Sequence, residues 1–290
     1  MSFIESISKS KDQITLYKLD ESVLKKHLEP SSLFSEEINV CFLDTETTGL
    51  KIDKDEIIEI ALRLLKIDKR TGSILSIENS YESFHDTDTI LDPNITLITG
   101  ITKDMIDGHK IDWTKVADIF DDSDIIIAHN ARFDRAFLDR YLAISKEKVW
   151  ACTHKDVNWL DRGFVKTSLE LLSTWHGFYY DSHRAMNDVD ALIHLVTHPS
   201  YVNEKPIIEV IKNSNKLHYK VVAVNSPFET KDILRSNYYR WNPNIRAWWK
   251  MIDEENVEKE RDWLTKNVYN GYCLATIEQL ALIDKYKKRF

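Results

Sequence analysis

A run of apolar residues that breaks off into acidic ones limits the folds open to this chain. Residues 38–45, INVCFLDT, lead into polar residues and Gly49, a pattern typical of a buried strand. Residues 57–68 and 73–85 follow, the first with apolar side chains at alternate positions. Lys69–Gly72 is short enough to join adjacent antiparallel strands. The three segments therefore predict an antiparallel meander.

Helical and strand patterns alternate through the next hundred residues. Helices are predicted at 93–98, 103–106, 113–120, 132–142, 168–176 and 184–196, and buried strands at 124–129 and 149–153. Residues 1–36 are polar and are predicted to be an extension with one short helix, Glu21–His27, ended by Pro30. The pattern as a whole predicts an α/β fold, a mixed sheet flanked by helices.

Charge divides the chain into two parts. Residues 1–204 carry 23 Lys and Arg against 36 Asp and Glu, whereas residues 205–290 carry 16 against 11. We therefore expect a main domain over 37–200 and a small basic, Trp-rich α+β domain over 206–290. The smaller domain is predicted to contain strands at 217–225 and 246–252 and helices at 229–237, 257–267 and 276–287.

Composition excludes several classes of protein. No run of about 18 apolar residues is present, so no membrane span is expected, and the first twenty residues lack the apolar core of a secretory signal. Three dispersed cysteines indicate a reduced, cytoplasmic protein. His194 and His198 are four apart on a helix but lack the glutamate of an HExxH zinc site, so no zinc is expected.

Four carboxylates and one histidine are the candidate catalytic residues: Asp44, Glu46, Asp134, His183 and Asp188. Asp44 and Glu46, two apart on a strand, must share one face of the sheet. Oxygen ligands of this kind suit Mg²⁺ or Mn²⁺, and two such ions can clamp the attacking and leaving oxygens of a phosphodiester. A histidine that titrates near neutrality suits proton removal from a water molecule. The set predicts phosphodiester hydrolysis.

Three segments resemble the exonuclease motifs of the DEDDh family, which includes the proofreading subunit of bacterial replicative polymerase. They are FLDTETTGL (42–50), AHNARFDRAFL (128–138) and HRAMND (183–188), and ITGIT (98–102) resembles the segment between the first two. The resemblance covers about 37–198. It implies a ribonuclease H-like fold, two Mg²⁺ or Mn²⁺ ions, and release of nucleoside 5′-monophosphates from 3′ ends.

Roles follow from the resemblance by position. It implies that Asp44 bridges both metal ions and that Glu46, Asp134 and Asp188 complete the shell. His183 is implied as the general base, on a loop before the last helix that is able to move toward the substrate.

The resemblance also implies residues that hold the terminal nucleotide. Thr47, Thr48 and Leu50 are the candidates around the first motif, with Leu50 packed on the last base. Turn formation and core packing are the alternative for these three. Asn130 and Phe133 complete the candidate set, and we interpret them as residues that pack behind the site rather than as direct contacts.

The basic domain contains a second candidate surface, which resembles a small module attached to nucleic-acid-processing enzymes. Its candidate contacts are Arg240, Trp241, Arg246, Trp248, Trp249 and Lys250. Aromatic rings stack on bases and basic groups neutralise phosphates, which favours a single strand fed 3′ end first to the nuclease. The alternative is that the tryptophans form the domain's own core. Asn242-Pro243-Asn244 is typical of a hairpin turn that makes Trp241 and Trp248 cross-strand neighbours.

Candidate partners follow from these motifs. The main ones are 3′ ends of single-stranded DNA or RNA, between which the motifs do not distinguish. Gln279–Ile283 resembles the glutamine-leucine peptide by which bacterial replication proteins hold the sliding clamp, and an amphipathic terminal helix explains it as well. A polymerase or clamp is therefore a further candidate partner. The alternative function is a nucleic-acid or replication-complex adaptor with incidental nuclease activity.

Overall fold

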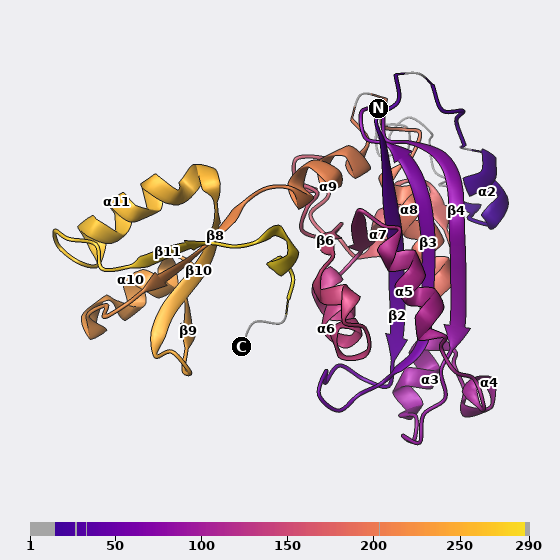
Figure 1. The fold of residues 1–290 in the computed structure, drawn as a ribbon, viewed down its shortest axis with the longest axis horizontal. Coiled ribbons are helices and arrows are strands. Elements are labelled where there is room, and N and C mark those ends of the chain that lie inside the picture. Colours follow the sequence, from indigo (N-terminus) through magenta and orange to yellow (C-terminus); the bar gives the residue numbers. More distant parts are fainter. Residues whose placement is uncertain (1–14, 27, 33, 203, 288–290) are drawn as a thin grey trace. The chain divides into compact units, whose positions relative to one another are not determined.

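The chain divides into two compact units, the first ending at Ser214 and the second beginning at Asn215. The computed structural model describes residues 15–26, 28–32, 34–202 and 204–287 (Figure 1). Among the described residues, no helix is both long and apolar enough to cross a membrane.

A five-stranded mixed sheet forms the centre of the first unit, in the order β4-β3-β2-β5-β6. Its strands are β2 (Glu37–Thr47), β3 (Ile57–Asp68), β4 (Ser73–Phe84), β5 (Ile125–Ala128) and β6 (Val149–Cys152). The first three pair antiparallel, and β5 and β6 join in parallel. The predicted meander and the α/β fold class are confirmed.

Helices flank this sheet, and the longest, α8 (Ala185–Val196), packs on β2 and β3 (Figure 1). The others are α3 (Pro93–Thr99), α4 (Lys103–Ile106), α5 (Trp113–Asp121), α6 (Ala131–Tyr141) and α7 (Leu169–Trp175), with a 3-10 turn at Ile144–Lys146. Each predicted helix of this region is present within two residues of its expected bounds.

The residues of β2 and β3 that face α8 are apolar in one half of the strands and acidic in the other half. Val40 pairs with Leu65, and both belong to the main core cluster. Further along, Asp44 pairs with Ala61 and Glu46 pairs with Glu59. Because alternate residues share a face, the apolar half anchors α8 and the acidic half lies at its N-terminal end. The core therefore positions the carboxylates.

Both flanks of the predicted main domain belong to the first unit. On the N-terminal side, β1 (Tyr17–Lys18) pairs in parallel with β7 (Phe178–Tyr179), and α2 (Glu21–Lys26) buries Leu24 in the core cluster. On the C-terminal side, α9 (Pro206–Ser214) adds a stripe of Ile207, Val210 and Ile211 to the same cluster. The boundary at Ser214 is therefore later than the change in charge indicates.

The second unit is a four-stranded antiparallel sheet with its two α-helices packed through one core. The strand order is β11-β8-β10-β9. The elements are β8 (His218–Ala223), α10 (Lys231–Ser236), β9 (Arg240–Asn242), β10 (Ala247–Asp253), α11 (Val257–Asn267) and β11 (Thr276–Gln279), with 3-10 turns at Phe228–Thr230, Glu254–Asn256 and Leu282–Asp284. The core joins Leu234 of α10 and Leu264 of α11 to Val221 of β8.

The helix predicted over residues 276–287 is wrong. Thr276–Gln279 form strand β11, which pairs antiparallel with β8, and Leu282–Asp284 form a 3-10 turn. Ile277 packs in the core of the unit while Glu278 is exposed, the alternation of a strand. Strand pairing with β8 therefore prevailed over local helix preference, and the terminal helix no longer explains the Gln279–Ile283 pattern.

Candidate active site

Three of the predicted carboxylates meet where β2 ends and α8 begins. Asp44 and Glu46 project from the same face of β2, and Asp188 lies in the first turn of α8. One carboxylate oxygen of each lies within 4.8 Å of the other two, and all three side chains are half-buried. The convergence depends on β2 and α8 packing together through the apolar half of the interface.

The electrostatics of this cluster are unfavourable for ionised carboxylates. Desolvation raises the pKa of Asp44 well above its usual range, and the charges of Asp188, Asp134 and Glu46 raise it further. Desolvation, followed by the charge of Asp188, raises the pKa of Glu46 to about 8. Desolvation also raises the pKa of Asp188 to about 6. Bound cations would relieve this repulsion, as hard oxygen donors at such spacing allow.

The fourth carboxylate, Asp134, lies beside the cluster and outside the group of three. It is in the first turn of α6 and is buried. The hydroxyl of Thr45, which projects from the opposite face of β2, donates to Oδ1 of Asp134 over 2.9 Å. Desolvation raises the pKa of Asp134 to about 7. Its charge acts on Asp44, but its side chain is held by Thr45 in this structure.

His183 lies just before α8 on a loop, as expected. Its backbone is left-handed, with φ of 61°, a conformation that is uncommon for residues other than glycine but is adopted more often by asparagine, aspartate and histidine. The imidazole is half-exposed, and its Nε2 lies 3.5 Å from Oε1 of Glu170. Ser182 donates its hydroxyl to the same carboxylate oxygen over 2.6 Å. Glu170, on α7, therefore holds the loop that carries the histidine.

Glu59 is a fifth carboxylate, missed in the sequence. It is 4% exposed and accepts the guanidinium of Arg184, with 2.9 Å between Nη2 and Oε1. The N–H of Ala185, the first residue of α8, donates to its other oxygen over 3.0 Å. Glu59 thus caps α8 and fixes the residue after His183. A single Glu inside an otherwise apolar strand segment, IIEIAL, was the available signal.

Tyr180 is the second residue that sequence reasoning missed. Its hydroxyl donates to Oδ1 of Asp188 over 2.9 Å. The N–H of Arg184 donates to the other oxygen of Asp188 over 3.2 Å. Burial, followed by the charge of Asp188, raises the pKa of Tyr180, so the phenol stays a donor. These two bonds set the orientation of Asp188.

The candidates after the first motif divide by exposure. Thr47 donates its hydroxyl to the carbonyl of Gly49 over 2.6 Å, and the hydroxyl of Thr48 accepts the N–H of Glu56 over 3.0 Å. Both threonines are buried and shape the turn that follows β2. Leu50 is 82% exposed and therefore does not pack in the core.

Asn130 and Phe133 lie at the start of α6, near Asp134. Asn130 occupies the N-cap position, is exposed and makes no side-chain capping bond. Phe133 is half-buried, and its ring centroid lies 5.0 Å from that of Phe137. A role in holding a nucleotide stays a prediction for both.

The predicted cation site has the right donors for a hard metal ion. Within the described part of the chain, Asp44, Glu46 and Asp188 are the one group of three His, Cys, Asp or Glu side chains close enough together to hold an ion. All its donors are carboxylate oxygens, which suit Mg²⁺ or Mn²⁺. His194 and His198 instead share the hydroxyl of Tyr17, at 2.5 and 3.3 Å from their Nε2 atoms.

The aromatic candidates of the second unit lie on both faces of its sheet. Trp241 and Trp248 are cross-strand partners with ring centroids 5.7 Å apart, which confirms the predicted hairpin. Trp248 packs against the core of the unit, whereas Trp249 pairs with Arg240 on the opposite face.

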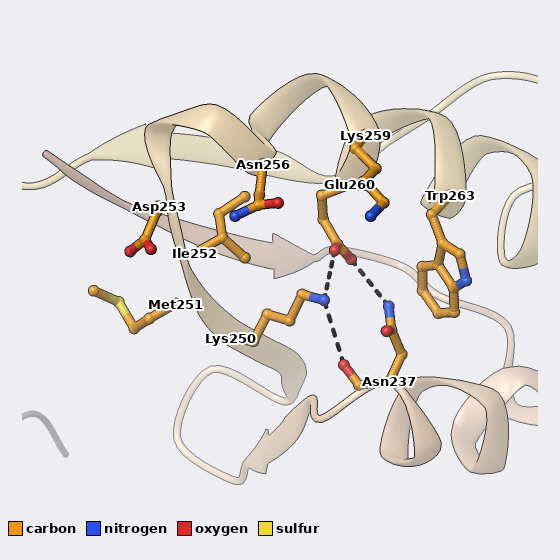
Figure 2. A pocket seen from close by; sticks show the side chains of 9 residues that line it. All are labelled: Asn237, Lys250, Met251, Ile252, Asp253, Asn256, Lys259, Glu260 and Trp263. Atoms are coloured by element: carbon orange, nitrogen blue, oxygen red, sulfur yellow. Dashed lines mark hydrogen bonds and ion pairs between the residues drawn. The ribbon is translucent and has the colours of Figure 1, made fainter. Parts of the chain in front are cut away.

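Lys250 points toward Glu260 of α11 (Figure 2) and is largely withdrawn from solvent. Its Nζ lies 2.5 Å from Oε2 of Glu260, and both side chains are at most 12% exposed. Tyr239 and Asn237 donate to the other oxygen of Glu260, over 2.8 and 3.2 Å. This network borders a pocket of about 410 Å³. Lys250 therefore joins β10 to α11.

The sequence matches a known family across this site. The RNase_T family model, described as Exonuclease, matches residues 41–196, which include all five predicted catalytic positions. The chain therefore belongs to the RNase_T exonuclease family.

The chain is also similar to segments of longer proteins. It is 35% identical over 128 residues to "DNA polymerase III PolC-type" of Oceanobacillus iheyensis, covering 42% of this chain and 8% of that protein. It is 32% identical over 117 residues to "DNA polymerase III subunit epsilon" of Treponema pallidum, covering 40% of this chain and 50% of that protein. The chain thus spans under a tenth of the first relative and half of the second.

A solved structure shares the fold. The zinc-bound form of an E. coli exonuclease I complex with single-stranded DNA aligns with a TM-score of 0.50, at 15% identity, over 74% of this chain and 63% of that one. At this identity the likeness shows the fold alone, and it agrees with the ribonuclease H-like sheet expected from the motifs.

Proposed function

We propose that this chain is a 3′–5′ exonuclease that removes nucleoside 5′-monophosphates from single strands with two Mg²⁺ or Mn²⁺ ions. The observation that carries the proposal is the convergence of Asp44, Glu46 and Asp188 within 4.8 Å of one another in a chain of the RNase_T family. The RNase_T match extends over all three motifs.

The carboxylates would hold the cations. Asp44, Glu46 and Asp188 supply the first ligands, and Asp134 completes the set by releasing the hydroxyl of Thr45. The ions, when bound, polarise the scissile phosphate and lower the pKa of water. Tyr180 keeps the carboxylate of Asp188 turned toward the cluster.

His183 would take the proton of the attacking water. Its imidazole reaches Glu170 in this structure, so it must turn from that carboxylate toward the cluster when substrate is present. Because α8 begins at Ala185, directly after Arg184, the ion pair of Arg184 with Glu59 limits that movement to the histidine loop. Proton transfer by a positioned histidine contributes about 10²- to 10⁴-fold to rate.

The terminal nucleotide would pack on Leu50. Leu50, an exposed leucine four residues after Glu46, would offer an apolar surface for the last base, and Thr47 and Thr48 hold the turn that presents it. The relatives named as DNA polymerase III proteins favour DNA as the substrate. They also favour a polymerase as partner.

The test is degradation of matched 5′-labelled DNA and RNA strands with Mg²⁺. A ladder that shortens from the 3′ end is expected, faster on DNA, and absent with chelator. His183→Ala and Asp188→Ala should each remove it, whereas Asp181→Asn, an exposed neighbour outside the cluster, should not. Internal cuts, or full activity in chelator, would contradict the proposal. Absence of turnover by the purified protein would favour the adaptor.

A further inference from the structure

A bulky residue in the second unit occupies a backbone position that usually belongs to glycine. Tyr238 follows α10 with φ of 64°, and the N–H of Tyr239 returns to the carbonyl of Leu234 over 3.0 Å to close the helix end. Helices commonly end with glycine at such a left-handed residue. Tyr238 is 85% exposed, so packing does not account for it.

A second bulky residue with a positive φ lies in the turn between β9 and β10. Arg246 has φ of 48° and is exposed. Asn225 and Asn270 also have positive φ, but asparagine tolerates that conformation. Tyr286 shares it too, yet is half-buried. Tyr238 and Arg246 are therefore strained residues that display a phenol and a guanidinium to solvent, and such strain is often retained at binding sites.

A half-exposed indole lies between these two positions in the sequence. Trp241 is 50% exposed and meets Trp248 edge to face, with 63° between the rings. The guanidinium of Arg235 lies over the ring of Trp248, 5.9 Å from its centroid. An exposed arginine and an exposed tryptophan thus approach the same ring.

Charge on this segment favours a polyanion. Residues 228–248 contain the cations Lys231, Arg235, Arg240 and Arg246 against the anions Glu229 and Asp232. Arg235, Arg240 and Arg246 are all exposed. The cations of this segment thus exceed its anions by two, and one of them, Arg235, lies 3.6 Å from Asp232.

We propose that Tyr238, Trp241 and Arg246, with Arg235, form a binding surface for single-stranded nucleic acid. The inference rests on the proposed function, and it adds a second place where the chain would contact its substrate, separate from the catalytic site of the first unit. Flat rings with open faces stack on unpaired bases, which a duplex keeps inside its own stack. Arginines beside them neutralise the phosphates that connect those bases.

Binding by the full chain tests the surface directly. Anisotropy of a 5′-labelled 20-nucleotide oligo(dT) is measured in chelator, where hydrolysis is suppressed. Trp241→Ala should weaken binding about 5- to 150-fold, the range for losing one stacked base. Arg246→Gly should weaken it less and reduce the slope of log affinity against log salt by about 1. Tyr272→Ala, which removes an 81% exposed tyrosine of the same unit, should leave affinity unchanged.

Tyr238→Gly separates binding from folding. Glycine relieves the left-handed strain, so the melting temperature should not fall, while affinity for oligo(dT) should fall several-fold. Loss of affinity together with a lowered melting temperature would assign Tyr238 a structural role and overturn the proposal for it. Affinities of all three variants within twofold of the parent, or tighter binding to a 20-base-pair duplex than to the single strand, would overturn the surface itself.

A small substrate distinguishes this surface from the nuclease site. The p-nitrophenyl ester of thymidine 5′-phosphate fits the catalytic site alone, so Trp241→Ala should hydrolyse it at the parent rate with Mg²⁺ while its KM for oligo(dT) rises. If the parent fails to hydrolyse either substrate, the exonuclease proposal fails while the anisotropy still tests the surface. If Trp241→Ala loses activity on the small ester as well, the surface proposal is overturned.

Discussion

The acidic strand end of the first unit and the aromatic hairpin of the second are both locally unfavourable, but in different ways. At Asp44 the cost is electrostatic, since like charges meet with little water. At Tyr238 and Arg246 it is conformational, since bulky residues occupy the left-handed region. His183, the proposed general base, also has a positive φ. A local cost is thus the common mark of both regions, and at Asp44 bound cations would relieve it.

Removing a cluster carboxylate from the first unit should abolish turnover without changing the affinity of the chain for single-stranded DNA. Asp44→Asn takes away a ligand on which both cations would depend, and turnover should fall about 10⁴-fold, since metal ions contribute several kcal/mol to such reactions. Affinity for oligo(dT) in chelator should stay unchanged, because the second unit is intact. Turnover within tenfold of the parent would break the assignment of the acidic region.

We expect the buried ion pair of the second unit, Lys250 with Glu260, to contribute to the stability of that unit. Lys250→Ala leaves Glu260 buried without its cation and should cost about 3–5 kcal/mol of unfolding free energy for that unit. Lys259, which is exposed and lines the same pocket, provides the control through Lys259→Ala (Figure 2). Denaturant titration followed by tryptophan fluorescence gives both values. Equal stability of the two variants would contradict the distinction.

The histidine loop should depend on a residue that makes no predicted contact with substrate. Arg184→Ala removes the ion pair with Glu59 but leaves the cap on the N–H of Ala185. Misplacing a catalytic group by about 1 Å can cost about 10²-fold, so kcat should fall by about that factor while KM changes little. Arg70→Ala, an exposed arginine of the same unit, serves as the control. A raised KM with unchanged kcat would place Arg184 at the substrate instead.

Residues of this site that belong to a motif can be predicted from the sequence, whereas residues that stand alone in the sequence cannot. Asp44, Glu46 and Asp188 stand in motifs with fixed spacing on recognisable elements, so their convergence could be anticipated. Glu59 and Tyr180 could not, because each is a single residue whose role depends on the register between β2 and β3 or on the path into α8. The hydrogen bond from Thr45 to Asp134 is likewise set by packing across the sheet.

The fold shows the same division. Strands such as Ile57–Asp68 are recognisable in the sequence because apolar residues recur along their whole length. Residues 276–279 do not, since four residues carry little periodicity and the unpaired edge of β8 decides their conformation. The boundary expected between residues 200 and 206 precedes the one at Ser214, because the charge distribution does not reveal that Ile207 and Val210 pack in the first core.

The smallest expected effect is a dependence of unfolding free energy on pH, which we expect for the first unit and not for the second. Glu46, Asp134 and Asp188 have pKa values raised to about 8, 7 and 6. At pH values between the ordinary pKa of each group and its raised pKa, the folded protein therefore binds more protons than the unfolded chain. The stability that these carboxyl groups contribute without metal should therefore be greatest at about pH 4 and below and should fall as the pH rises to 8, by about 1.4 kcal/mol per pH unit for each excess proton that the folded protein binds. Each kcal/mol of this loss corresponds to about 2–4 °C in melting temperature.

Divalent cations should cancel this slope, because they favour the ionised carboxylates that protons otherwise neutralise. Melting curves at pH 5 to 8, with chelator and with saturating Mn²⁺, measure both slopes for the first unit. Asp188→Asn removes one of the interacting charges and should flatten the slope without metal while reducing the shift that Mn²⁺ produces. The second unit has no such carboxylate cluster among its described residues, so its transition should not respond to the cation. A melting temperature of the first unit that rises with pH in chelator would show that the carboxylates are not crowded, and the contrast between the two regions would be lost.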